Sequence, residues 1–295
     1  VTAWIARGDF AAARAHLEKA VALYRSERDR DLRFRFGQDI GVSAMAYFGL
    51  VQWVLGEPER ARAAMVEMMR LARETAHAPT IAHAHLHLAI LEMVRLDPAS
   101  ARPQAEACLV IAREHGLGLW SAISPLYLAW ATASSEPTPA NWDAFARLNA
   151  AVREQGLSSG PTWLSPPLAW GMAEAGDPER ALGIVDQTIT AMEGQHFWDP
   201  EVYRVQGEIL LRRDPADAAS AEEAFQTAIA LARRQKARAF ELRAALALAR
   251  LYHATGRAAA ARALLAPALE GFSPTPEFPE IETARALLLR LDPGH

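Results

Sequence analysis

The sequence predicts an all-α protein that is built as a stack of helical hairpins. Small or apolar residues recur at positions i, i+4 and i+7 of successive segments, and each set begins 40 residues after the one before. A turn containing Gly, Asp or Pro precedes most of these sets, and no segment shows the sustained alternation of apolar and polar residues typical of a strand. A period in this range indicates a solenoid, in which stacked hairpins bury a continuous core.

The second helix of each expected hairpin carries the recurring triplet. Positions i, i+4 and i+7 share one face of an α-helix, so the triplet marks the face that we expect to be buried. The triplets are Ala61/Met65/Met68, Ala101/Ala105/Cys108, Asn141/Phe145/Leu148, Ala181/Val185/Thr188, Ala221/Phe225/Ala228 and Ala261/Leu265/Ala268. An earlier copy, Ala13/Leu17/Ala20, lies 48 residues before the first of these. Its extra residues fall near the charged stretch SERDRDLRFRFGQ, which we expect to form a solvated helix end and a loop.

The turns between paired helices also recur. We expect them near residues 8, 56, 97, 137, 176, 215 and 256, in stretches such as ARGDF, LGEPE and EAGDP. Gly ends one helix in a left-handed conformation, and Asp or Pro starts the next. The first helix of each pair carries a small residue that lets its partner approach closely. These residues are Gly49, Ala89, Ala129, Ala169, Gly207 and Ala249.

These patterns predict one solenoid over residues 1–295, with about seven hairpins and a terminal capping helix at about 276–291. The chain begins at Val1, without an initiator Met and inside an expected helix. We therefore interpret the chain as a fragment of a longer protein.

The composition narrows the class of protein. Hydrophobic residues make up 51% of the 295 residues and charged residues 22%, which is typical of a globular protein with a substantial core. The net charge of −4 gives no electrostatic reason to expect nucleic acid or an anionic membrane as a partner. The single cysteine, Cys108, excludes an intrachain disulfide framework. We found no membrane-length apolar run and no signal peptide, so the expected location is the cytoplasm.

The small residues and the Gly-Asp or Gly-Glu turns resemble tetratricopeptide repeats, although the 40-residue period is longer than the usual 34. The chain resembles the longer-helix variant of bacterial regulators of the maltose-regulator type. The segment HFWDPEVYRVQGEILL and the helices after it are similar to the C-terminal repeats of bacterial multidomain signalling proteins. This similarity is strongest from Phe197 to Phe272 and continues, more loosely, from about Gln38 onward.

The resemblance implies that the hairpins form a right-handed superhelix. It also implies that other domains precede this superhelix in the same polypeptide. In the signalling proteins, a class III nucleotide cyclase or a DNA-binding domain precedes an AAA/STAND-type ATPase and then the helical array. This chain contains no cyclase motif, no phosphate-binding Gly-rich loop with Lys and no winged-helix pattern. We therefore expect the fragment itself to be non-enzymatic.

The first helix of each pair lines the concave surface of such solenoids, and partners bind there. Aligning the first helices by the repeat places eight residues on the C-terminal and central parts of this surface. They are Trp130, Trp163, Trp170, Glu201, Arg204, Glu208, Arg243 and Arg250. The same register places Leu50, Trp53, His83, Ile90 and Met93 nearer the N-terminus.

Two features of this surface allow alternative interpretations. The central tryptophans form either an aromatic pocket or packing between repeats, and Ser-Pro sequences near residues 124 and 165 predict helices that start late or bend. The stripe Glu201/Arg204/Glu208 forms either a charge network that fixes stacking, with Arg243 and Arg250 as partners, or the polar end of a binding site.

The segment HAHLH raises the hypothesis of a metal site, because His83 and His87 are four residues apart and share a helix face. No third ligand stands at motif spacing, so we predict no metal and no cofactor. Cys108 has no His at helical spacing, and no Ser lies in a G-x-S-x-G sequence, so nucleophilic catalysis is not predicted.

The resulting hypothesis is a non-catalytic interaction or sensor module of a bacterial signalling or transcription-regulatory protein. It would bind a protein, a peptide or a small effector on its concave face and pass that state to upstream domains. The alternative is a structural spacer or a homodimerisation platform whose groove binds nothing.

Overall fold

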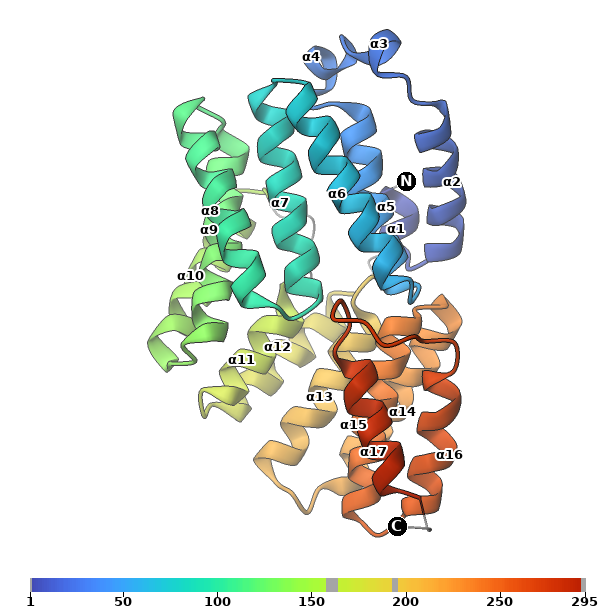
Figure 1. The fold of residues 1–295 in the computed structure, drawn as a ribbon. Coiled ribbons are helices and arrows are strands. Elements are labelled where there is room, and N and C mark those ends of the chain that lie inside the picture. The colour runs from blue at the N-terminus through green and yellow to red at the C-terminus, as the bar shows by residue number, and fades with distance from the viewer. Residues whose placement is uncertain (1, 158–163, 193–195, 293–295) are drawn as a thin grey trace.

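The computed structural model describes residues 2–157, 164–192 and 196–292, and these residues form an array of α-helices (Figure 1). Within the described ranges there are seventeen helices, and consecutive helices pack pairwise as hairpins. The hairpins are α1 (Thr2–Ala6) with α2 (Phe10–Leu23), α5 (Ile40–Val54) with α6 (Pro58–Glu74), α7 (Ala78–Val94) with α8 (Pro98–Glu114), α9 (Gly118–Ser135) with α10 (Pro139–Glu154), α11 (Ser165–Glu174) with α12 (Pro178–Thr190), α13 (Asp199–Arg213) with α14 (Ala218–Gln235), and α15 (Arg238–Ala254) with α16 (Ala258–Leu269). The predicted all-α class and hairpin pairing are confirmed.

Three helices fall outside the hairpins. The short helices α3 (Ser26–Asp29) and α4 (Leu32–Phe36) occupy the charged stretch after α2, where the sequence predicted a helix end and a loop. The terminal helix α17 (Glu280–Arg290) follows the last hairpin. It begins later than the expected residue 276 because Pro279 disfavours a helical conformation of the residue before it.

The recurring triplets lie on the buried faces of the second helices. All three members of the triplets that begin at Ala61, Ala101, Ala181, Ala221 and Ala261 are buried. The small residues of the first helices face these triplets closely. A Cβ atom added to Gly207 would lie 2.6 Å from the Phe225 side chain, so only glycine fits at this crossing of α13 and α14.

The turns show how sequence sets the hairpin geometry. Leu96 takes the place that glycine holds in other turns and adopts a positive φ of 62°, a conformation that L-residues enter at a cost. Asp97 follows it and accepts a hydrogen bond from Ser100 N at 3.0 Å, which caps α8. Gly56, in the turn between α5 and α6, has no room for a side chain, because an added Cβ atom would lie 2.8 Å from Arg238 Cβ.

That contact belongs to a closure of the array that the repeat pattern did not predict. The seventh hairpin returns to the second: the Trp53 ring on α5 lies 6.0 Å from the Phe240 ring on α15 and 5.2 Å from the Phe278 ring before α17. Figure 1 shows the loop between α16 and α17 lying against the lower ends of α5, α6 and α7. The described chain therefore closes on itself.

An ion-pair cluster accompanies this closure, and we call Arg62, Glu92, Arg95 and Glu277 the closure cluster. Arg62 pairs with Glu92 at 2.8 Å and with Glu277 at 2.9 Å. Arg95 pairs with Glu92 and lies 3.2 Å from Glu277. Glu92 is only 3% exposed. Losing a partner would leave its carboxylate buried with less compensation.

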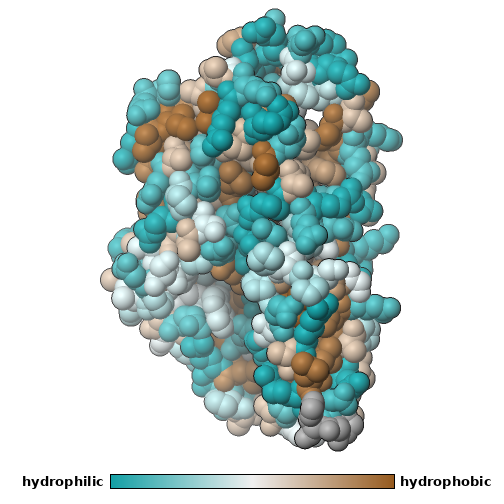
Figure 2. All heavy atoms as spheres, in the orientation of Figure 1, coloured by the Kyte–Doolittle hydropathy of each residue, from teal (hydrophilic) through white to brown (hydrophobic). Residues whose placement is uncertain are grey.

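The outer surface is mainly hydrophilic on the face drawn in Figure 2, with separate hydrophobic patches. One patch lies at the upper left, where Figure 1 places α8 and α9. Val110 and Leu119, which belong to these helices, are 53% and 46% exposed. Among the described helices, none combines the length and apolarity needed to cross a membrane.

Candidate functional site

The first helices of the later hairpins surround a groove with a volume of about 1000 Å³, which we call the central groove. Most of its lining comes from α9, α11, α13, α15 and α17 and from the turn between α7 and α8, and Trp142 of α10 and Phe225 of α14 also line it. Seven of the eight predicted residues lie here, namely Trp130, Trp170, Glu201, Arg204, Glu208, Arg243 and Arg250. The eighth, Trp163, lies outside the described residues. The repeat register therefore brought together residues that the fold also brings together.

Trp130, Trp142 and Trp170 line the groove and differ in how much of each ring is exposed. Trp130 and Trp142 are each only 3% exposed. Trp142 packs so closely on α11 that a Cβ atom at Gly171 would lie 2.3 Å from its ring. Trp170 is half-buried, and the Arg212 guanidinium lies 5.4 Å from its ring centroid. Trp130 and Trp142 thus mainly pack the core, whereas Trp170 still presents part of its ring to the groove.

The Ser-Pro sequences behave differently in the two helices. α11 begins at Ser165 with proline in its first turn, as the sequence predicted. α9 begins earlier, at Gly118, and contains Pro125. The Ser124 hydroxyl donates to Trp120 O at 2.6 Å, one turn back along this helix. Of the two expected outcomes, α11 therefore shows the late start, whereas in α9 the proline lies inside the helix.

The charged stripe forms a network within α13. Arg204 donates to both Glu201 oxygens, at 2.9 and 3.0 Å, and pairs with Glu208 at 2.8 Å. Burial works against the charge of Arg204, but the Glu201 and Glu208 carboxylates outweigh that effect and raise its pKa above the ordinary value. Glu201 and Arg204 are buried, at 2% and 9% exposure. The stripe is therefore largely satisfied by its own members.

Arg243 connects this stripe to the rest of the molecule. Its Nη1 donates to Val94 O on α7 at 2.8 Å and lies 3.8 Å from Glu201. Its Nε donates to Glu280 on α17 at 2.6 Å, and its guanidinium lies 4.8 Å from the Trp53 ring centroid. One buried side chain therefore joins α15 to α5, α7, α13 and α17.

Arg250 does not join the network as the sequence suggested. It is exposed at the groove and makes no ion pair with any described residue. Arg243 Nη2 and Glu280 Oε2, by contrast, are buried and have no hydrogen-bond partner within the described part of the chain.

The histidines of α7 and Cys108 were the candidates for a metal site and for nucleophilic catalysis. His87 Nδ1 lies 3.0 Å from His83 O, and His85 Nδ1 lies 2.9 Å from Gln104 Oε1. In the described ranges no three His, Cys, Asp or Glu side chains converge as metal ligands would. Cys108 is buried beside the Ser124 hydroxyl at 3.0 Å, and burial raises the pKa of its thiol to about 11. The thiol is therefore protonated near neutral pH and poorly nucleophilic.

Comparisons with known proteins assign no family to this chain. No protein-family model matches this chain. No curated protein matches it either. Among solved structures, the chain is similar to BtubC (BKLC) from P. vanneervenii, with 17% sequence identity and a TM-score of 0.34 over 90% of this chain and 94% of that chain. The class defined by the helical pairs themselves is a tetratricopeptide-like array of hairpins.

Proposed function

We propose that this chain is a non-catalytic interaction module that binds a peptide segment of a partner protein in the central groove. The observation that carries the proposal is the convergence of seven repeat-related residues on one groove that has an aromatic side and a charged side. A helical-hairpin array typically presents such a surface to extended partners. The proposal includes no turnover by this chain.

The groove chemistry indicates what kind of peptide fits. The exposed guanidinium of Arg250 can pair with a carboxylate, because no described residue neutralises it. The partly exposed ring of Trp170 offers an apolar contact nearby. The volume of about 1000 Å³ lies at the upper end of the range for small-molecule sites. We therefore favour a peptide that carries acidic and apolar side chains over a single small effector.

The test begins with peptide display against the immobilised chain, followed by fluorescence polarisation of the selected peptides. Arg250→Glu should weaken an acidic peptide at least tenfold, because it replaces attraction with repulsion. Arg147→Glu is the matched control, since Arg147 is exposed on α10 away from the groove and makes no ion pair with a described residue. Equal affinities of the two variants for every selected peptide would contradict the proposal.

The alternative is a spacer or homodimerisation platform. The near-complete burial of Trp130 and Trp142 favours it, because packing already covers most of the surface of these rings. Light scattering over a hundredfold range of concentration separates the two. A mass that doubles with concentration, together with no selected peptide, would favour the platform.

The signalling context is part of the proposal. The resemblance noted for the segment from Phe197 onward suggests that a bound state is passed to domains upstream in the same polypeptide. Comparing peptide affinity for this chain alone and for the full polypeptide would test that transmission.

A further inference from the structure

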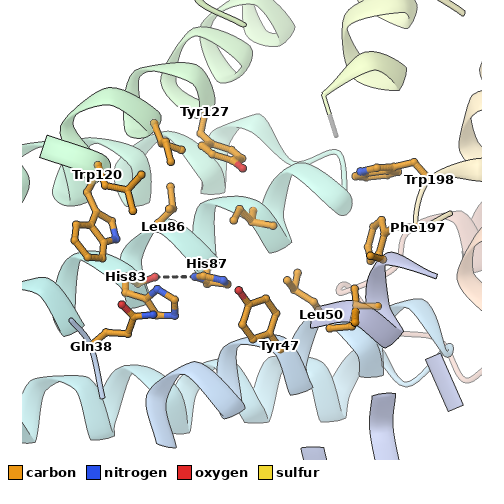
Figure 3. A pocket seen from close by; sticks show the side chains of 16 residues that line it. Gln38, Tyr47, Leu50, His83, Leu86, His87, Trp120, Tyr127, Phe197 and Trp198 are labelled. Atoms are coloured by element: carbon orange, nitrogen blue, oxygen red, sulfur yellow. Dashed lines mark hydrogen bonds between the residues drawn. The ribbon is translucent and has the colours of Figure 1, made fainter. Parts of the chain in front are cut away.

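A second cavity lies near the N-terminal end of the array and is separate from the proposed peptide site. It has a volume of about 540 Å³, and we call it the N-terminal cavity. Residues of α1, α5, α7 and α9 line it, together with Phe197 and Trp198 just before α13 (Figure 3). Its volume falls within the usual range for small-molecule sites.

The walls of this cavity are mainly apolar. Leu50, Leu86 and Ile90 contribute aliphatic surface, and Trp120 and Tyr127 contribute rings from α9. No Asp, Glu, Lys or Arg belongs to its described lining. A charged ligand would lose its hydration without gaining an opposite charge, so the walls favour an uncharged molecule.

The polar groups of the cavity are few. They belong to Gln38, Tyr47, His83 and His87, together with the Tyr127 hydroxyl and the indole N–H groups of Trp120 and Trp198 (Figure 3). His87 Nδ1 lies 3.0 Å from His83 O, and a carbonyl oxygen only accepts, so the proton of neutral His87 sits on Nδ1. Its Nε2 therefore carries a lone pair. The Tyr47 ring meets the His87 ring edge-on at 5.2 Å.

His83 is the group that most directly indicates a ligand. It is 5% exposed, and its Nε2 is buried without a hydrogen-bond partner among the described residues. Its ring lies 4.1 Å from the His87 ring and lines the cavity. Buried polar atoms are nearly always paired with protein, water or a ligand. A ligand with a complementary donor or acceptor would pair this atom.

We propose that the N-terminal cavity binds an uncharged, mainly apolar small molecule that hydrogen-bonds to His83. This is a different site and a different class of ligand from the peptide proposed for the central groove. Trp198 lines both spaces. The two sites are therefore neighbours and need variants that tell them apart.

The first experiment uses N-phenyl-1-naphthylamine, an uncharged fluorescent probe with one N–H donor. Tryptophan excitation with probe emission reports proximity, because Trp120 and Trp198 line the cavity. We expect saturable binding that 1-naphthol displaces. 1-Methylnaphthalene, which lacks the hydroxyl, should displace the probe about tenfold less well, and 1-naphthoate at least tenfold less well. Equal potency of naphthoate and naphthol, or no saturable probe binding, would overturn the proposal.

Two leucine substitutions then locate the site. Leu86→Trp adds bulk inside the cavity and should weaken probe binding at least tenfold. Leu289→Trp makes the same exchange at a side chain that is 63% exposed on α17, and it should leave the affinity unchanged. Equal affinities for these two variants would show that the probe binds elsewhere and would refute the assignment.

The role of His83 has its own test. In His83→Leu the preference for 1-naphthol over 1-methylnaphthalene should fall from about tenfold to near one, while apolar binding persists. The nitrogen-15 shifts of the His83 ring, recorded on the unaltered protein, provide a measurement that does not depend on the variant folding. Addition of 1-naphthol should move the Nε2 resonance. An unchanged resonance at saturation would refute the hydrogen bond. Both results are independent of whether any peptide binds the central groove.

Discussion

The two buried histidines of α7 make stability depend on pH. Burial lowers the pKa of His83 below its ordinary value, and the neighbouring His87 lowers it further. Burial also lowers the pKa of His87 to about 4. In the unfolded chain both groups bind protons near pH 6.5. The unfolded state therefore holds more protons between these values, and stability falls as the pH decreases from about 6.5 towards 4.

Replacing one of these histidines should remove part of that pH dependence. The difference in pKa of His87 corresponds to roughly 3 kcal/mol of stability that is present above pH 6.5 and lost by pH 4. Urea unfolding at pH 7.5, 6.0 and 5.0 should therefore show a smaller loss for His87→Gln than for the unaltered chain. The exposed His253→Gln is the control and should keep the full loss. Parallel curves for the two variants would contradict this account.

Arg243 and Arg250 lie on the same helix and differ in what they contact. Arg243→Met would leave Glu201 and Glu280 with less compensation and remove a donor from Val94 O. We expect a loss of about 3–5 kcal/mol, as for one partner of a buried ion pair. Arg250→Met should stay within about 0.5 kcal/mol, because Arg250 is exposed and unpaired among the described residues. Chemical denaturation measures both, and similar values would refute the structural role of Arg243.

Two glycines inside helices, Gly207 and Gly183, differ in the space available for a side chain. A Cβ atom at Gly207 would lie 2.6 Å from Phe225, whereas one at Gly183 on α12 would meet nothing within 4 Å. Gly207→Ala should therefore cost about 1–3 kcal/mol through overpacking. Gly183→Ala should stabilise the protein by about 0.5–1 kcal/mol, since alanine loses less conformational entropy in a helix. Thermal unfolding would show opposite shifts in Tm, and a shift of the same sign would contradict the packing argument.

The repeat pattern of the helices explains which parts of the structure the sequence could predict. Triplets at i, i+4 and i+7 encode a buried helix face locally, so the hairpins and most of the groove register follow from them. Which side chains pair with one another inside the groove depends on distances that the repeat register does not specify. Arg243 reaches Glu201 and Arg250 does not, although both stand on the predicted face. The proline in α9 illustrates the same limit, because Ser-Pro can begin a helix or lie inside one.

Closure of the whole array was beyond the reach of the sequence pattern. It joins residues more than 180 positions apart, such as Trp53 with Phe240 and Arg95 with Glu277. A repeat period specifies only contacts between neighbouring repeats. The N-terminal cavity also joins distant segments, because Phe197 and Trp198, just before α13, complete a lining that begins with residues of α1 and α5. Thus the sequence placed Leu50, His83 and Ile90 on the inner face but gave no sign that they enclose a cavity.

The closure cluster should decide whether the array stays shut. Glu277 accepts ion pairs from Arg62 and Arg95 and is the contribution of the C-terminal loop to the cluster. Glu277→Lys would place a third positive charge beside these two arginines, so the loop should leave α6 and α7. We expect a larger radius of gyration by small-angle scattering and faster amide exchange in the turns around residues 56 and 96.

A matched charge reversal separates closure from net charge. Glu223 is exposed on α14 and forms no ion pair with a described residue, so Glu223→Lys changes the total charge equally without touching the cluster. Its scattering curve and exchange rates should match those of the unaltered chain. Because apolar contacts of Trp53 with Phe240 and Phe278 also hold the array shut, the opening by Glu277→Lys should be larger at low salt, where repulsion is least screened. A Glu277→Lys variant that stays compact at low ionic strength would show that the closed form is maintained without the closure cluster, by the aromatic contacts and by Arg243.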